Sequence, residues 1–313
     1  MITNEGEGIG NFVIVDAPGG RFEVWDESMF GNIGFTGISG SWASGIRPTS
    51  LEVDAASRTL FTGVRDASWG SRLRVDRLTF DASGRPIGTW QNVCPLRSAS
   101  SFEVRGDTVY LLVDTSSSYR LEWRDAHDCT LRGSTTVALP AGRVRPASHG
   151  RSILAFDTQT STLMVGVELQ ASSGRREVFV NRHWISADGS STGDDTYFGN
   201  ILPANAKLID LDAQDGFLLV TSWQPDYDPT STNYELDLYY NNSSRWRLED
   251  TLVTNEVTNR ESAVAIAARG FTGQPCGAGK SGSYLWIARG PGGTNRWTGF
   301  DHHLLERRAI CAD

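Results

Sequence analysis

Four carboxylates stand at or beside the ends of predicted strands that hold equivalent places in the chain: Asp16, Asp66, Asp114 and Glu168. Ca²⁺ is a hard cation that takes about six to eight oxygen ligands, so clustered carboxylates could hold it. They could instead face a basic partner. An Asp at a strand end also opens a turn by bonding to its own backbone, and this interpretation needs no ligand. Calcium binding is therefore a hypothesis beside a purely structural alternative.

The longest predicted connection, residues 222–233, mixes aromatic and acidic side chains with two prolines. Its candidate contacts are Trp223, Asp226, Tyr227 and Asp228, and Trp69 stands in another predicted loop. Carbohydrate sites combine an aromatic ring that stacks on a sugar with carboxylates that accept hydroxyl protons. The pattern favours a ligand contact here, and a loop folded back on its own sheet is the alternative.

The four cysteines suggest two pairs, Cys94 with Cys129 and Cys276 with Cys311. None forms a C-x-x-C motif, so zinc or thioredoxin-like chemistry is not expected. Two disulfides would indicate an oxidising compartment, whereas free buried thiols are the alternative. The first residues show no signal peptide, so we expect either a cytosolic protein or a secreted, periplasmic or cell-surface one whose leader was removed. The cysteines favour the second.

The amino-acid composition argues against several classes of function. The net charge is −8, with 39% hydrophobic and 21% charged residues, which is typical of a globular protein and argues against a nucleic-acid partner. No apolar run is long enough to predict a membrane span. Neither a Gly-x-Ser-x-Gly elbow nor a His-Glu-x-x-His motif occurs, and residues 188–195 lack the closing Glu of an EF-hand.

A repeated pattern carries all these residues. Residues 49–65 show it best: an alternating strand, an Asp-led turn and a second strand. No segment shows a sustained helical period, and the pattern predicts antiparallel units of four strands. A four-stranded sheet cannot bury both its faces alone, so such units are expected to pack face to face. The predicted units span residues 1–40, 49–93, 100–139, 150–200, 206–254 and 262–311.

The chain resembles the β-propeller superfamily over roughly its whole length. The recurring pieces are Leu51-Glu52-Val53-Asp54, Phe102-Glu103-Val104-Arg105, Leu154-Ala155-Phe156-Asp157 and Ile209-Asp210-Leu211-Asp212. The resemblance implies an all-β, single-domain propeller of four-stranded antiparallel blades, six in number, with seven as the alternative. Only three strands are clear in the first unit, so either residues 2–9 supply its inner strand or the chain starts inside a blade. No WD40, Kelch or sialidase signature identifies a subfamily.

The resemblance also implies where a ligand would bind. Loops from second to third strands, together with the connections between blades, crowd one face that propellers commonly use. The first hypothesis is a secreted or cell-surface binding module for a glycan or protein partner. The second is a Ca²⁺-dependent hydrolase of the six-bladed lactonase kind, for which the innermost strands offer Glu52, Glu103 and Asp210. A structural scaffold in a surface assembly is a further alternative.

Overall fold

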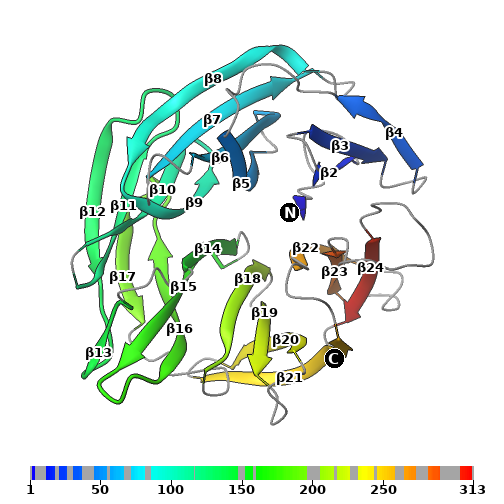
Figure 1. Cartoon of the computed structure of the whole chain (residues 1–313). Helices are drawn as coiled ribbons and strands as arrows, with labels where there is room; N and C mark the ends of the chain where they lie inside the picture. Colours follow the sequence, from blue (N-terminus) through cyan, green and yellow to red (C-terminus); the bar gives the residue numbers. More distant parts are fainter. Residues whose placement is uncertain are drawn as a thin grey trace. The chain divides into compact units, whose positions relative to one another are not determined.

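A computed structural model describes the protein at the following residues: 2–3, 12–17, 21–26, 31–36, 46–54, 57–66, 72–81, 86–115, 117–146, 152–157, 160–195, 205–214, 217–225, 232–242, 245–257, 264–272, 281–289 and 304–311. All regular secondary structure in these residues is β-strand, and the strands form six antiparallel sheets (Figure 1). No helix among them is long and apolar enough to cross a membrane. The chain divides into two compact units: Met1–Asp114 with Arg120–Thr135, and Thr115–Tyr119 with Thr136–Asp313.

The first unit is built from two sheets and most of a third, each with its strands paired in chain order; Tyr119 and residues 136–137 of the third sheet belong to the second unit. The first sheet contains β1 (Ile2–Thr3), β2 (Phe12–Ala17), β3 (Arg21–Asp26) and β4 (Gly31–Thr36). The second contains β5 (Ile46–Asp54), β6 (Thr59–Asp66), β7 (Leu73–Phe80) and β8 (Pro86–Arg97). The third contains β9 (Ala99–Arg105), β10 (Thr108–Asp114), β11 (Tyr119–Asp125) and β12 (Leu131–Val137).

Apolar packing joins the second and third sheets. One buried cluster combines Phe61, Leu73 and Val75 of the second sheet with Phe102 and Leu111 of the third. These residues alternate along their strands, which places them on one face of each sheet. The Cys94–Cys129 disulfide connects β8 to the turn after β11, as the sequence predicted.

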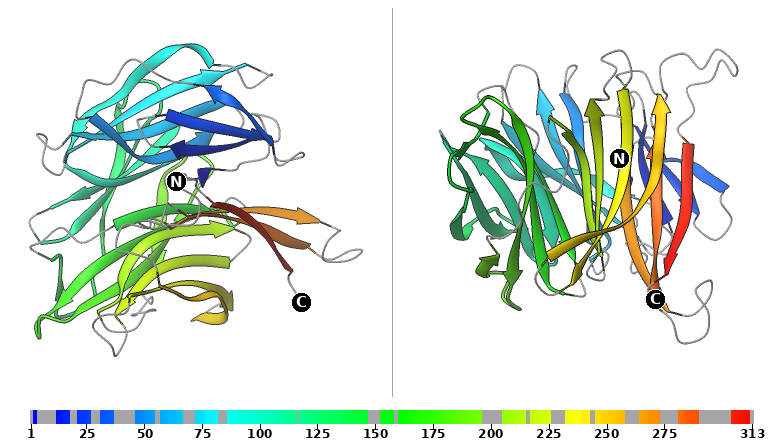
Figure 2. Two further views of the ribbon diagram at one scale, coloured as in Figure 1. Left: turned by 45° about the vertical axis from the view of Figure 1, so that its right-hand side comes forward. Right: turned by 90° about the horizontal axis from the view of Figure 1, so that it is seen from below.

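The second unit also contains three sheets (Figure 2). Its first has β13 (Arg143–Val144), β14 (Ser152–Asp157), β15 (Thr162–Ala171), β16 (Arg176–Ile185) and β17 (Ser191–Asp195). Its second has β18 (Lys207–Gln214), β19 (Phe217–Pro225), β20 (Thr232–Asn242) and β21 (Arg245–Val257). Its third has β22 (Val264–Thr272), β23 (Ser281–Arg289) and β24 (Leu304–Cys311).

Close packing between the first two sheets of this unit depends on a glycine. A Cβ atom at Gly166 would lie 3.0 Å from Leu211 Cδ2 and 3.1 Å from Leu208 Cδ2. Both leucines belong to a buried cluster that also contains Met164 and Val178. The missing side chain therefore lets β18 pack against the face of β15.

The inner strands of successive sheets lie side by side within each unit. In the first unit β1 contacts β5 and β5 contacts β9, and in the second β14 contacts β18 and β18 contacts β22 (Figure 1). Apart from β13, the other strands of each sheet follow in chain order away from this inner strand. This arrangement is that of propeller blades.

Several strand predictions can now be compared with the structure. Ile2 and Thr3 form β1, which pairs with β2, so the N-terminal residues do supply the missing inner strand. Residues 140–146, which lie between two of the predicted units, contain β13, and this strand extends the edge of β15 beyond β14. That the units form one domain remains a prediction.

Candidate functional site

The hairpin between β15 and β16 is the second-to-third-strand connection of its sheet. Its turn is closed by two hydrogen bonds, from the Ala171 N–H to the Arg175 carbonyl and from the Gly174 N–H to the Ala171 carbonyl, both 2.9 Å long. Gly174 has a φ of 82°, which a residue with a Cβ adopts only at a cost. The turn places two consecutive arginines, Arg175 and Arg176, where β16 begins.

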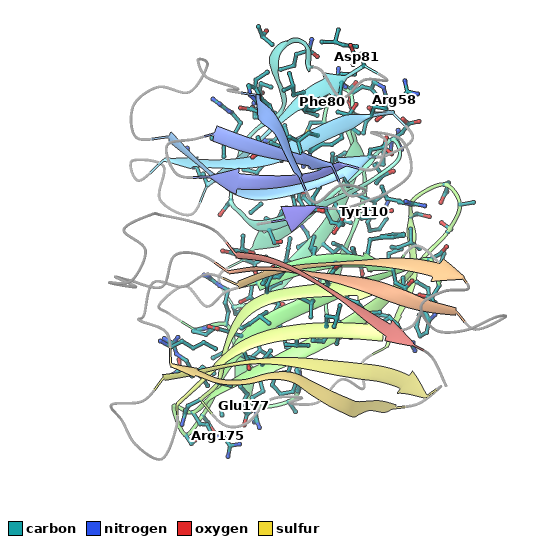
Figure 3. The ribbon with its side chains drawn as sticks, turned by 90° about the vertical axis from the view of Figure 1, so that its right-hand side faces the viewer. Arg58, Phe80, Asp81, Tyr110, Arg175 and Glu177 are labelled. Carbon is teal, nitrogen blue, oxygen red and sulfur yellow. A yellow bond between two sulfur atoms is a disulfide. The ribbon has the colours of Figure 1, made fainter. Side chains whose placement is uncertain are left out.

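Two arginines, Arg143 and Arg175, contact the carboxylate of Glu177. Arg143, on β13, donates through Nε to Glu177 Oε2 and through Nη2 to Oε1, the latter at 3.4 Å. Arg175 Nε lies 3.6 Å from Glu177 Oε1 (Figure 3). Only 7% of the Glu177 side chain is exposed, against 30% of Arg143 and 49% of Arg175. The guanidinium groups therefore reach solvent while the carboxylate does not.

Glu168 lies on the opposite face of the same hairpin, because it pairs with Val178 whereas Glu177 pairs with Leu169. Its Oε1 accepts a 2.9 Å hydrogen bond from the Leu208 N–H, and its Oε2 lies 3.8 Å from Arg176 Nη1. Its backbone carbonyl accepts a 3.4 Å bond from the Tyr119 hydroxyl. Glu168 thus links β15 to β18 while Arg176, which is 33% exposed, offsets its charge.

We name Arg143 and Arg175, which both contact the carboxylate of Glu177, the arginine cluster. It presents two partly exposed cations around one buried carboxylate, in a chain whose net charge is −8. Guanidinium groups bind carboxylates and other oxyanions through paired hydrogen bonds, as Arg143 already does with Glu177. The site is therefore suited to binding an anionic group.

Sequence reasoning singled out Glu168 but missed the arginines around it. The available signal was the doublet Arg175-Arg176 directly after a glycine in a predicted hairpin. Arg143 could not be found in this way, because only the pairing of β13 with β15 brings it to Glu177.

The four predicted metal ligands lie on second strands. Asp66 and Asp114 end β6 and β10, Asp16 is the penultimate residue of β2, and Glu168 lies inside β15. The side chains of Asp16 and Asp66 lie outside the described residues. Among the side chains that are described, no group of three or more His, Cys, Asp or Glu residues converges as a metal site would require. Calcium binding stays a prediction.

The predicted ligand loop is shorter than expected. Trp223 lies within β19, paired with Lys207 and Tyr234, because this strand continues to Pro225. Asp226, Tyr227, Asp228 and Trp69 lie outside the described residues, as does Cys276, whereas Cys311 ends β24. A glycan contact at these positions remains a prediction.

Several aspartates have the turn-forming role that was the alternative to ligand binding. Asp54 Oδ2 accepts a 2.5 Å bond from the Ser57 hydroxyl, and Asp157 Oδ1 accepts a 3.2 Å bond from the Thr160 N–H. Asp188, in the segment 188–195, accepts hydrogen bonds from Ser186 and Ser190, which lower its pKa to about 2. That segment is a turn followed by β17 rather than a loop.

His183 forms a buried polar contact in the second unit. Its Nδ1 lies 3.3 Å from the Ser191 hydroxyl, its side chain is fully buried, and burial lowers its pKa to about 4 although Asp194 opposes this shift. Ser191, His183 and Asp194 are the three residue types of a nucleophilic triad. However, in a triad the serine bonds to the histidine nitrogen opposite the one that faces the carboxylate. Here His183 Nε2 is buried and has no hydrogen-bond partner among the described residues, so no triad geometry is formed.

The innermost-strand carboxylates have local backbone partners. Glu103 Oε1 accepts a 3.0 Å bond from the Val104 N–H, and Asp210 Oδ1 accepts one of the same length from the Leu211 N–H. Glu103 is only 5% exposed. The lactonase-like arrangement stays a prediction.

Comparison with known proteins agrees with this architecture. A solved structure described as glucose dehydrogenase has a TM-score of 0.50 and 9% identity, covering 96% of this chain and 92% of that one. The WD40 repeats of RRP9 score 0.47 at 9% identity, covering 99% and 94%. A prolyl endopeptidase scores 0.49 at 10% identity, and the chain spans 39% of that enzyme's length while 92% of this chain is covered.

The described residues form antiparallel sheets of three to five strands, with adjacent inner strands within each unit. The protein has the β-propeller fold, and the six sheets agree in number with the six blades predicted. No protein-family model matches the chain, and no curated protein matches it either. At these identities the similarity shows the fold alone.

Proposed function

We propose that this propeller is a binding module for an extracellular or cell-surface partner, and that the arginine cluster contacts the partner. The cluster is the observation that carries the proposal: it lies at a second-to-third-strand connection, and its two arginine side chains are 30% and 49% exposed. The Cys94–Cys129 disulfide supports an oxidising compartment. The partner is a protein or a glycan.

A screen on peptide and glycan arrays tests the proposal. The matched variants are Arg175→Glu, at the cluster, and Arg72→Glu, at an exposed arginine in the first unit. We expect at least one ligand that wild type and Arg72→Glu both retain and that Arg175→Glu loses. A complete absence of hits, or hits that all survive Arg175→Glu, would overturn the role of the cluster. Hits lost on Trp223→Ala instead would assign the contact to the end of β19.

The calcium-dependent hydrolase is the alternative function, and thermal unfolding separates it from the binding module. A ligand that binds the folded state raises Tm by mass action. A metal enzyme should therefore show a calcium-dependent rise in Tm that EDTA removes. An unchanged Tm in millimolar calcium would count against this alternative.

A further inference from the structure

We propose that the arginine cluster recognises carboxylate side chains of an acidic polypeptide segment; this rests on the proposed binding function and specifies the partner's class. The cluster places two cations against one carboxylate, and only the cations are substantially exposed. A ligand approaching from solvent therefore meets positive charge although the chain as a whole is acidic.

The cluster has only a small excess of positive charge, and this favours a ligand with few negative charges over a dense polyanion. Glu177 already offsets part of the cluster's charge. The remaining charge is suited to one or two carboxylates, because a dense polyanion would bring many more negative charges toward a chain of net charge −8. The contact between Arg143 and Glu177 shows the paired geometry that a second carboxylate can adopt at a guanidinium.

The neighbouring residues favour a peptide over a sugar. The turn of the hairpin consists of Ala171, Ser172, Ser173 and Gly174, and it presents no aromatic ring. Sugar sites usually rely on stacking against such a ring. Exposed arginines beside small polar residues are instead suited to binding an acidic side chain through charge-assisted hydrogen bonds.

The buried carboxylate of Glu177 also holds Arg143 in place. Arg143 is fixed by two bonds to Glu177, so it loses less side-chain freedom when a ligand binds. Arg175 is the more exposed of the two arginines and makes the longer contact with Glu177, 3.6 Å. Charge reversal at Arg175 is therefore the substitution that disturbs the fold least.

The test is an NMR titration of the full chain labelled with ¹⁵N-arginine. The probes are an oligoglutamate peptide, an oligoglutamine peptide of equal length, inorganic phosphate and a heparin-derived oligosaccharide. We expect oligoglutamate to shift arginine Nε–H signals that disappear from the spectrum of Arg143→Gln or Arg175→Glu. Its affinity should fall about tenfold in Arg175→Glu and stay unchanged in Arg72→Glu, in line with the loss of roughly one charge-assisted bond. Affinity should also weaken as salt is raised.

The other outcomes overturn the inference. Oligoglutamate that does not bind at millimolar concentration, or that binds Arg175→Glu as tightly as wild type, excludes acidic-segment recognition here. Binding of oligoglutamine would show that charge is not what is recognised. Heparin or phosphate that shifts the arginine signals and is not displaced by oligoglutamate would assign the cluster to a sulfated glycan or to simple anions. In any of these cases an array hit lost in Arg175→Glu would still support the binding module.

Discussion

The buried His183 should make the stability of this protein depend on pH between neutrality and about pH 4. Burial lowers the pKa of His183 from 6.5 to about 4 in the folded state, with Asp194 as an opposing influence. The unfolded chain therefore binds a proton that the folded chain excludes throughout this interval. Stability is fully present above the unfolded pKa and is lost as the pH falls toward the folded pKa.

The magnitude follows from the size of this shift. Each pKa unit corresponds to about 1.4 kcal/mol, so the full loss is about 3 kcal/mol, of which about 2 kcal/mol occurs between pH 7 and pH 5. Asp125 and Asp188 have pKa values of about 2. Hydrogen bonds stabilise the charged forms of these two carboxylates. Their contribution to the unfolding free energy is therefore lost only as the pH falls below the ordinary aspartate range.

Urea unfolding at pH 7, 6 and 5 measures the effect. His183→Gln removes the titrating group while keeping a polar side chain beside Ser191, and it should flatten the dependence over this interval. His127→Gln is the matched control, because His127 is 66% exposed and should leave the dependence unchanged. An equal pH slope in wild type and His183→Gln would refute the assignment to His183.

Three further changes test the packing. Replacing both Cys94 and Cys129 by Ser should cost about 4 kcal/mol of unfolding free energy, because the disulfide closes a separation of 35 residues; an unchanged urea midpoint would contradict this. Gly133→Ala should cost about 1–3 kcal/mol of unfolding free energy, because the new Cβ would lie 2.4 Å from the Trp123 ring. Gly193→Ala is the control and should cost far less, because its Cβ would lie 3.9 Å from Trp184. Equal urea midpoints for the two variants would refute the clash. Glu168→Ala should cost about 3 kcal/mol of unfolding free energy, because the Leu208 N–H loses this acceptor and Arg176 loses this carboxylate. Arg72→Ala is the control and should leave the unfolding free energy unchanged.

Much of the fold could be predicted because strand alternation and turn chemistry are local properties. Val104 and Phe102 on β9, and Asp54 and Asp157 in turns, behave as their sequence context indicates. The candidate site could be predicted only in part. Glu168 was selected as a possible metal ligand from its strand position, but its partners come from β16 and β18 and depend on how sheets pack.

The sequence alone determined that this is an all-β repeat protein, which pairs of strands form hairpins, and that Cys94 could reach Cys129. These features depend on residues close in the chain or on a regular period. Tertiary structure decided that Glu168 and Glu177 are buried on opposite faces of one hairpin, that Arg143 joins Arg175 at Glu177, and that Arg176 contacts Glu168. The physical reason is that a charged side chain is stabilised by whichever partners packing brings to it, and those partners lie up to 40 residues away in the sequence.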